Sequence, residues 1–416
     1  LYFDNFGTIN IDNIIDHGFL FNNNNGTITG NNAGDININT TTLHGFHCYN
    51  VAANSDFPLN INFTNTGNVS VMNTQQNAFY NYTYRYGTLN FVNDGTMTAN
   101  QCLQKGVYNY SDNNFATLNF TNNGDINIDN TTQQGWYNYS KQTSVDTLTA
   151  LYCTNNGTID INNTVLEGWQ NYAYRGVIHC ENGENGNISI KNASDHGLLN
   201  YNLEDQPGYH AILTFDNYGV IQIDSTNYNG LYNSNYRGDT LSFNNYGNIS
   251  INHSLEDGNY NYNYVSVIDS PFYYYGTSVM NINNFGTMNI DNSTEYGMFN
   301  YDDRGEELYF TNYGNLNIAT TGIHGIYNRC RPNGDYYTPS LTFDNIEGTI
   351  NISATTLDGI YNYAQNDTIY YRNNGTLMLN DIGQNGIYNY TTGVGASADF
   401  YNNATLTLTN IAKNGI

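Results

Sequence analysis

A repeat of about 30 residues runs through this chain and constrains its fold more than any other feature. In one copy an apolar pair, Leu241 and Phe243, precedes Gly247, and a second pair, Ile249 and Ile251, follows it. The residues of each pair are two positions apart, which is the period of a β-strand with one buried face. Each copy therefore predicts short strands that are separated by chain reversals at glycine.

Two glycine positions mark the repeat. The first recurs at Gly7, Gly34, Gly67, Gly95, Gly124, Gly157, Gly186, Gly219, Gly247, Gly286, Gly314, Gly348 and Gly375, and Asn403-Ala404 takes its place in the last copy. The second follows eleven positions later at Gly18, Gly45, Gly106, Gly135, Gly168, Gly197, Gly230, Gly258, Gly297, Gly325, Gly359, Gly386 and Gly415, with Ala78 as the substitute. Because this spacing is constant while the repeat length varies, we predict one rigid part per copy.

The strand pattern predicts an all-β fold in which copies stack on one another. One copy buries about five apolar side chains, worth roughly 7–15 kcal/mol, which is less than the cost of ordering its residues. We therefore predict a parallel β-helix (β-solenoid) of about 14 coils, with three short strands per coil and a right-handed winding. We expect a single repeat domain over residues 1–416, cut in phase with the repeat at both ends. A leucine-rich repeat, a propeller and an antiparallel sandwich fit the pattern less well.

Composition limits the partners. The net charge of −25 argues against nucleic acid and against anionic membrane surfaces, because both need Lys and Arg, so we expect no nucleic-acid partner. No apolar run is long enough to span a membrane, so we expect no membrane insertion. Charged residues make up 11% of the chain, against roughly 25% in ordinary domains. The acidic surface permits divalent cations and keeps a long particle soluble.

The columns Leu-x-Phe-x-Asn-x-Gly-Thr-Ile-x-Ile-x-Asn resemble microbial β-solenoid surface proteins. These include filamentous-haemagglutinin-type adhesins, autotransporter passenger domains and their archaeal counterparts. The resemblance covers the whole chain and concerns architecture alone. It implies an extracellular, cell-surface protein with a fibrous or adhesive role, and it transfers no catalytic residue. Pectin-lyase-like enzymes share this superfold, so the fold does not decide the function.

Asparagine occupies two columns of the repeat. The first column lies three positions after the second glycine: Asn81, Asn109, Asn138, Asn171, Asn200, Asn233, Asn261, Asn300, Asn328, Asn362 and Asn389. The second column lies two positions before the first glycine: Asn5, Asn65, Asn93, Asn122, Asn155, Asn217, Asn245, Asn284, Asn312 and Asn373. Asparagine tolerates left-handed backbone geometry and bonds nearby backbone groups. Stacked amides also bond to one another, so we predict two structural ladders.

Tyrosine flanks the first asparagine column. The residues are Tyr80, Tyr82, Tyr108, Tyr110, Tyr137, Tyr139, Tyr260, Tyr262, Tyr361, Tyr363, Tyr388 and Tyr390. If the asparagines face inward, alternation along the strand places these rings outside. They are candidates for a self-supporting aromatic surface, an interface between copies of the protein, or a sugar-stacking face. Tyr also precedes Arg85, Arg175 and Arg237, which predicts stacking of the guanidinium groups on rings.

The sequence predicts neither a catalytic nor a cofactor site. Carboxylate neighbours (Glu204/Asp205, Glu256/Asp257, Asp302/Asp303 and Glu306/Glu307) lie in turns, where one could bind Ca²⁺. The eight His are scattered without ligand spacing and there is no Cys-x-x-Cys, so we expect no metal site built from His or Cys. Cys153 and Cys180 fall in equivalent positions of adjacent coils. They could form a disulfide or remain a pair of thiols in the core.

Three functions fit these observations. The first is a structural subunit or segment of an extracellular filament, sheath or surface appendage, assembled by self-association with other copies of itself. The second is an adhesin that binds glycans or cell surfaces through its Tyr-rich face. The third is a carbohydrate-active β-helix enzyme, which predicts a groove holding two or three carboxylates from adjacent coils. We expect a protein that is not an enzyme.

Overall fold

The computed structural model describes residues 1–24, 26–51, 59–144, 148–205, 209–265, 278–304, 307–331 and 340–416. The chain divides into two compact units. The first comprises Leu1–Asp195 and Gly208–Leu213, and the second comprises His196–Pro207 and Thr214–Ile416. The described residues form strands and turns, and none of them belongs to a helix. Accordingly, they contain no helix that could cross a membrane.

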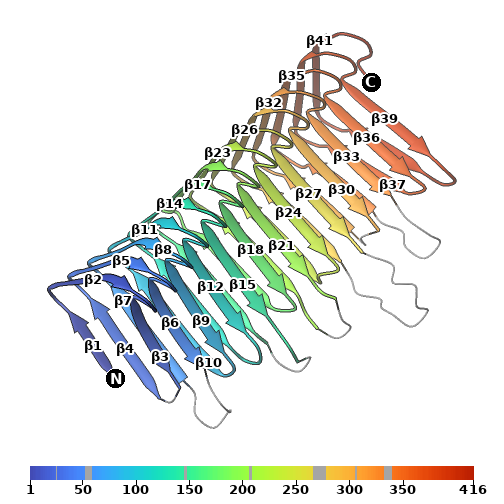
Figure 1. Ribbon diagram of the computed structural model, residues 1–416. Helices are drawn as coiled ribbons and strands as arrows, with labels where there is room; N and C mark the ends of the chain where they lie inside the picture. The colour runs from blue at the N-terminus through green and yellow to red at the C-terminus, as the bar shows by residue number, and fades with distance from the viewer. Residues whose placement is uncertain are drawn as a thin grey trace. The chain divides into compact units, whose positions relative to one another are not determined.

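In the first unit, every third strand along the chain joins the same sheet, which gives three parallel sheets (Figure 1). Sheet A contains β1 (Tyr2–Asn5), β4 (Thr27–Asn32), β7 (Leu59–Asn65), β10 (Gly87–Asn93), β13 (Thr117–Asn122), β16 (Ala150–Asn155) and β19 (Val177–Asn182). Sheet B contains β2 (Thr8–Ile14), β5 (Asp35–Thr41), β8 (Asn68–Thr74), β11 (Thr96–Cys102), β14 (Asp125–Thr131), β17 (Thr158–Thr164) and β20 (Asn187–Ala193). Sheet C contains β3 (Phe19–Asn23), β6 (Phe46–Val51), β9 (Phe79–Tyr84), β12 (Val107–Asp112), β15 (Trp136–Lys141) and β18 (Trp169–Tyr174).

The second unit has the same three sheets. Sheet A contains β22 (Ile212–Asn217), most of which lies in this unit, β25 (Thr240–Asn245), β28 (Val279–Asn284), β31 (Glu307–Asn312), β34 (Ser340–Asn345), β37 (Thr368–Asn373) and β40 (Ser397–Asn402). Sheet B contains β23 (Val220–Thr226), β26 (Asn248–Ser254), β29 (Thr287–Ser293), β32 (Asn315–Thr321), β35 (Thr349–Thr355), β38 (Thr376–Ile382) and β41 (Thr405–Ile411). Sheet C contains β21 (Leu198–Leu203), β24 (Leu231–Tyr236), β27 (Asn259–Tyr264), β30 (Met298–Asp303), β33 (Ile326–Arg331), β36 (Ile360–Gln365) and β39 (Ile387–Thr392).

The predicted parallel β-solenoid is confirmed in both units. Each unit has seven A strands and seven B strands among its described residues, so its strands form about seven coils. Like residues pair in register: Ile126 pairs with Ile159, and Ile159 pairs with Ile188. All three are at most 1% exposed. The right-handed winding and the single domain over residues 1–416 stay predictions.

Alternation along each strand separates the core from the surface, as the period of two predicts. In β14, Ile126 and Ile128 are buried while Asn127 is exposed. The two tryptophans of sheet C, Trp136 and Trp169, stack in the core with ring centroids 4.8 Å apart. Because an indole N–H needs a partner when it is buried, each donates to the asparagine two residues later, at 2.9 Å.

Both predicted asparagine ladders are present inside the solenoid. In sheet C of the first unit, the side-chain amide of Asn81 donates to Asn109, and Asn109 donates to Asn138, at 2.8 and 2.9 Å. Sheet A repeats the pattern, for example from Asn65 to Asn93 at 2.8 Å. The Asn65 amide also donates to the carbonyl of Gly67 at 3.1 Å. Buried amides therefore bond in register from coil to coil, which satisfies polar groups that water cannot reach.

The inner and outer ladders run in opposite directions. In the two buried ladders the donor lies in the earlier coil, as in the bond from Asn233 to Asn261. Outward-facing asparagines reverse this order, as in Asn119 to Asn90 and Asn317 to Asn289. Because amide dipoles that run in opposite directions partly cancel, the two sets avoid building one large dipole along the coils.

Tolerance of left-handed backbone geometry was one reason for expecting asparagine in the two ladder columns. The ladder asparagines do not have this geometry, since none of them has a positive φ angle. Most of the residues with positive φ occupy another column, close to the end of every B strand: Asn13, Thr40, Asn73, Gln101, Asn130, Asn163, Asn192, Ser225, His253, Asn292, Thr320, Ala354, Asp381 and Asn410. Their φ angles lie between +53° and +61°. The pairing register skips this residue, since Asn100 pairs with Asp129 and Cys102 with Thr131. The column therefore marks a bend that is repeated in each B strand.

The glycine columns separate strands as predicted, but close approach between coils explains them better than backbone conformation. Neither Gly106 nor its equivalents in this column have a positive φ. A Cβ on Gly106 would lie 2.4 Å from Ile128 Cγ2, and one on Gly45 would lie 2.1 Å from Val71 Cγ1. Ala78 is the exception in this glycine column. In the coil that follows Ala78, the position that Val71 and Ile128 occupy in their own coils is taken by Ala99. The small Ala99 leaves the space that the methyl group of Ala78 needs.

We therefore predict that Gly106→Ala destabilises the protein by about 1–3 kcal/mol, because the new methyl overlaps Ile128. Ile128→Ala alone should cost about 2–5 kcal/mol. The double variant recreates the Ala78/Ala99 pair. Its loss of stability should therefore be at least about 1 kcal/mol smaller than the sum of the losses in the two single variants. Denaturant unfolding of the four proteins measures this coupling. Additive losses would show that the two columns are not in contact.

Candidate functional site

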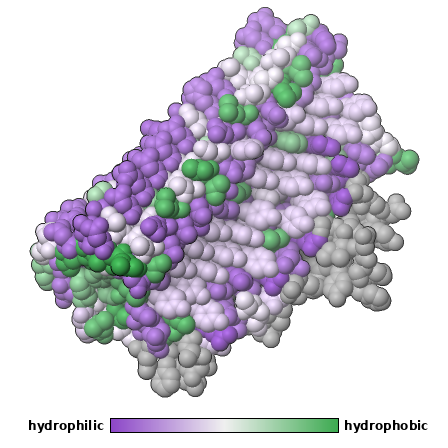
Figure 2. Space-filling model, viewed as in Figure 1, coloured by the Kyte–Doolittle hydropathy of each residue, from purple (hydrophilic) through white to green (hydrophobic). Residues whose placement is uncertain are grey.

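The outer face of sheet C is covered by columns of tyrosine. All twelve of the predicted tyrosines lie there, and an asparagine of the ladder separates the two in each strand. Ten are partly buried, and Tyr388 and Tyr390 are 42% and 43% exposed. Over the C strands of each unit, the surface lies near the middle of the hydropathy scale (Figure 2). We call this surface the tyrosine face.

Rings of the tyrosine face stack on one another from coil to coil. Tyr108 lies 4.9 Å from Tyr80 and 5.1 Å from Tyr137 between ring centroids, with interplanar angles of 16°. In the second unit, Phe299 lies 4.8 Å from Tyr260 with an angle of 4°. Near-parallel rings at this spacing cover each other's faces. The face therefore presents mainly ring edges and hydroxyl groups to its surroundings.

Cations take part in the same stacks. Arg329 occupies a tyrosine position, with its guanidinium carbon 4.7 Å from the Tyr301 ring and 5.7 Å from the Tyr363 ring. Lys105 Nζ lies 4.9 Å from the Tyr108 ring and 5.2 Å from the Tyr137 ring. These contacts extend the aromatic columns by cation–π interactions.

The predicted stacking of arginine on the preceding tyrosine is confirmed at all three positions. The guanidinium carbons of Arg85, Arg175 and Arg237 lie 4.9, 4.7 and 5.4 Å from the centroid of the adjacent tyrosine ring. All three arginines have positive φ angles. They therefore sit in tight turns at the ends of C strands, with the side chain folded back on the ring.

Burial shifts the ionisation of the tyrosine face. It raises the pKa of Tyr232 to about 12, and it also raises that of Tyr80 and Tyr260, with neighbouring tyrosines adding to the effect. A tyrosine whose pKa is higher in the folded state stabilises the fold fully below its unfolded value of about 10. This stability is lost as the pH rises through the folded value.

We expect an ultraviolet titration of tyrosinate formation in the native protein to show a separate late rise, near or above pH 12, from the buried rings of the tyrosine face. Unfolding, followed by circular dichroism, should accompany the rise. The same titration in denaturant serves as the control and should have its midpoint near pH 10. A native titration in which all tyrosines ionise in one phase near pH 10 would contradict the stacked, partly buried face.

A second aromatic column, which was not predicted from the sequence, lies at the turn between sheets A and B of the second unit. Tyr218, Tyr246, Phe285 and Tyr313 stack with centroids 4.6 to 4.8 Å apart, and each is 40% to 42% exposed. The signal was an aromatic residue immediately before the first glycine in four successive copies. In the sequence these residues looked like parts of separate turns, because their stacking depends on the register of the coils.

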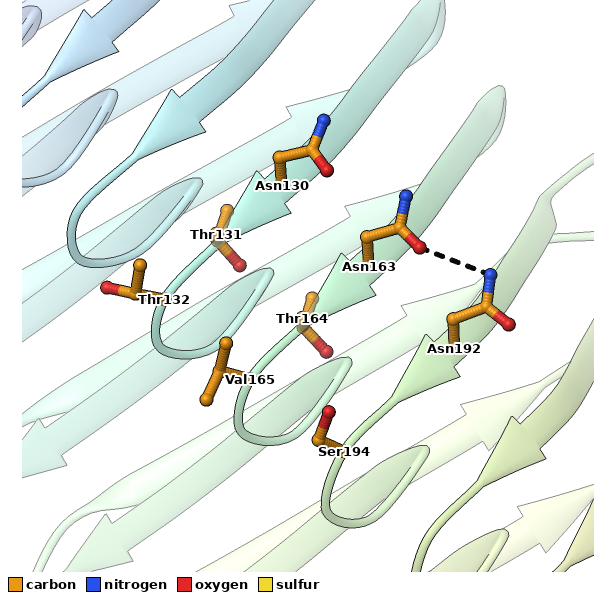
Figure 3. A pocket seen from close by; sticks show the side chains of 8 residues that line it. All are labelled: Asn130, Thr131, Thr132, Asn163, Thr164, Val165, Asn192 and Ser194. Carbon is orange, nitrogen blue, oxygen red and sulfur yellow. Dashed lines mark hydrogen bonds between the residues drawn. The ribbon is translucent and has the colours of Figure 1, made fainter.

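A shallow groove of about 450 Å³ follows the bend at the ends of three B strands of the first unit (Figure 3). Its lining is Asn130, Thr131, Thr132, Asn163, Thr164, Val165, Asn192 and Ser194. The Asn192 amide donates to Asn163 at 3.2 Å. Glycoside hydrolysis needs paired carboxylates, and the residues that line this groove are amides, hydroxyls and one valine.

Three histidines come together in the first unit, although the sequence shows no ligand spacing among them. His17 and His44 immediately precede the second glycine of adjacent coils, and His47 lies on β6. Their potential ligand atoms all lie within 4.8 Å of one another. Burial, aided by the neighbouring imidazoles, lowers the pKa of His44 to about 3 and of His47 to about 2. A separation of 27 residues equals the length of this coil, so the solenoid register was the missing signal.

The prediction that all the carboxylate neighbours lie in turns is wrong for Asp302 and Asp303, which belong to β30, and for Glu307, which begins β31. Among the described residues, the histidine cluster is the one place where three His, Cys, Asp or Glu side chains bring their ligand atoms together. Asp257 is buried and accepts a hydrogen bond from the Tyr296 backbone N–H at 3.1 Å, and burial raises its pKa well above the usual range. Glu306 lies outside the described residues. Calcium binding at one of these turns stays a prediction.

Cys153 and Cys180 are opposite each other in register in β16 and β19, as the sequence predicted. Both are buried, and the structure has them as thiols. Cys180 Sγ lies 3.2 Å from Asn171 Oδ1 of the asparagine ladder. This arrangement corresponds to the core thiol pair, while oxidation to a disulfide stays a prediction.

No protein-family model matches this sequence. No curated protein matches it either. Among solved structures, the chain is similar to a fragment of TibA whose hyper-glycosylation was catalysed by TibC. The identity is 12%, the match covers 98% of this chain and 99% of that chain, and the TM-score is 0.20. So low a TM-score supports no inference about this chain, whose function must be argued from its own residues and their geometry.

Proposed function

We propose that this chain is a structural subunit or segment of an extracellular filament, sheath or surface appendage, and that copies of it associate through their tyrosine faces. The chain acts without a catalytic centre in this proposal. The observation that carries it is the tyrosine face itself, a set of stacked rings that continues from coil to coil within each unit. Tyr is enriched at protein interfaces because one side chain offers both apolar area and a hydroxyl group.

The geometry of the rings favours a protein partner over a sugar. A sugar ring stacks on an exposed aromatic face, whereas within a column each face is covered by the next ring at about 5 Å. Edges and hydroxyls remain outside, and these can interdigitate with an equivalent row on another copy. Burial of the rings on one side already limits their rotation, so an interface would lose little further side-chain entropy.

Charge limits this association to conditions that screen repulsion. Each copy carries a net charge of −25, so two copies repel one another at low ionic strength. On the tyrosine face itself, cations such as Lys105 and Arg329 lie against the rings, and Asp112 accepts from the Tyr82 hydroxyl at 3.3 Å, so charges of both signs are present there. Association should therefore strengthen as salt is added, in contrast to binding that depends on opposite charges.

We expect negative-stain microscopy of the purified protein at neutral pH and moderate salt to show fibres or laterally associated rods. A variant with Tyr110→Ser, Tyr139→Ser and Tyr262→Ser should associate at least about tenfold more weakly by sedimentation, if the lost contacts contribute about 1.4 kcal/mol or more. Ser234 already occupies this column, between the Tyr201 and Tyr262 rows, so serine is compatible with the strand.

The matched control changes the outer face of sheet B, with Asn127→Ser and Asn289→Ser, and should assemble like the original protein. Dispersed monomers over a wide concentration range, at every salt concentration, would contradict the proposal. That outcome would favour the adhesin hypothesis, which a glycan array then tests directly. Equal assembly of the tyrosine variant and the original protein would show that another surface carries the association.

A further inference from the structure

From the histidine cluster we infer a metal site: we propose that His17, His44 and His47 bind one divalent transition-metal ion of the borderline class, such as Zn²⁺, Ni²⁺ or Co²⁺. The rings are in mutual contact, with centroids 5.2 Å apart for His17 and His44 and 4.6 Å apart for His17 and His47. They come from two adjacent coils, so a bound ion would link the coil of β1–β3 to the coil of β4–β6.

His47 supplies the strongest argument for a ligand. Its side chain is 6% exposed, and both ring nitrogens are buried without a hydrogen-bond partner. A neutral imidazole has one N–H and one lone pair, and leaving either unpaired in the interior is unfavourable. A metal ion bound to the lone pair removes half of this penalty. The equivalent residue in the next coil is Tyr80, so the stack itself does not require a histidine here.

His17 contributes a second unpartnered ring nitrogen to the cluster. Its Nδ1 is buried without a partner, while its Nε2 lies 3.6 Å from Asp16 Oδ1. A carboxylate beside one ring nitrogen favours the proton on that nitrogen and leaves the other free to bind a metal. The pair therefore has the arrangement of a metal-binding histidine with an orienting carboxylate.

His44 is the third candidate ligand, and its Nδ1 makes only long hydrogen bonds. Its Nδ1 lies 3.3 Å from the backbone nitrogen of Asn77 and 3.3 Å from the Asn77 side-chain nitrogen, which is the long limit of a hydrogen bond. A lone pair is thus already present on Nδ1, and coordination exchanges this contact for a metal bond without displacing a proton. The ring would turn slightly away from Asn77 as it binds.

The donor set decides the class of ion. Nitrogen ligands at the 2.0–2.1 Å typical of Zn²⁺ lie about 3.4 Å from one another, so the ring nitrogens would have to approach by about 1 Å. Because His17 and His44 now stack with an interplanar angle of 21°, their rings would also have to tilt until both lone pairs point at the ion. Three imidazoles suit Zn²⁺, Ni²⁺, Co²⁺ and Cu²⁺, whereas Ca²⁺ and Mg²⁺ need oxygen ligands. Three ligands leave further coordination positions for water.

Isothermal titration with ZnCl₂ at physiological ionic strength tests the site in the whole protein, with CaCl₂ as the comparison ion. We expect one equivalent of Zn²⁺ to bind and Ca²⁺ not to compete. The test variant combines His44→Asn and His47→Tyr, which are the residues of the same columns in the next coil, so the fold should persist. The affinity of this double variant for Zn²⁺ should be at least about 100-fold lower. Loss of a residue that only orients a ligand lowers metal affinity by up to about 100-fold, and here two ligands are lost.

Two further readouts separate a metal site from general cation binding by an acidic protein. Co²⁺ should give visible absorption bands of imidazole coordination that the double variant lacks. Zn²⁺ should also raise the melting temperature of the original protein and leave that of the double variant unchanged. His253→Asn, at an exposed position beside Asp224, is the control and should bind like the original protein. Unchanged Zn²⁺ affinity in the double variant, or displacement of Zn²⁺ by Ca²⁺, would overturn the proposal.

Discussion

The hydrogen bond between the side-chain amides of successive coils is the interaction on which the rest of this structure depends. Asn109 and Asn138 are completely buried, and each amide finds its partner only when the next coil stands directly above it. A slip by one residue would turn the asparagines outward and force the flanking tyrosines into the core. The apolar columns would tolerate approximate stacking, whereas buried amides require a single register.

The surface follows from this register. Since Asn109 faces inward, Tyr108 and Tyr110 face outward, and in-register stacking places each ring over its counterpart in the next coil. Ring faces are thereby used within the protein, and ring edges with hydroxyl groups are left for a partner. The same register that satisfies the core produces a continuous aromatic surface, which is the basis for proposing a structural role in an assembly. The histidine cluster arises in the same way: His17 and His44 are equivalent in adjacent coils, and His47 lies beside them on β6.

Much of the architecture could be predicted from the sequence because each structural role keeps its residue type in one column. The core of sheet B was predictable from the recurring isoleucines, such as Ile126, Ile159 and Ile188. The ladder that begins at Asn81 was predictable from the regular spacing of the asparagines after it. The stacking of Arg85 on Tyr84 was predictable because both residues are neighbours in the chain. Local pattern and period carried these predictions.

The remaining features depend on distances between coils, which a sequence states only indirectly. The glycine at position 106 is needed because Ile128 of the following coil approaches it, and the Ala78/Ala99 pair reveals this contact only once the register is known. His44 and His47 looked isolated until His17 was placed beside them by the turn of the coil. The left-handed column that contains Asn163 has mixed composition, so no residue type marked it.

The stability lost on removing one buried ladder amide tests the central claim most directly. Asn261 accepts from Asn233 at 2.9 Å and donates to Asn300 at 2.8 Å, so Asn261→Ala leaves one donor and one acceptor buried without partners. This should cost about 2–6 kcal/mol in denaturant unfolding, at about 1–3 kcal/mol for each group. Asn289→Ala, in an outward ladder with the same kind of bond to Asn317, should cost less than about 0.5 kcal/mol. Equal losses in the two variants would contradict the claim that the buried amides hold the coils in register.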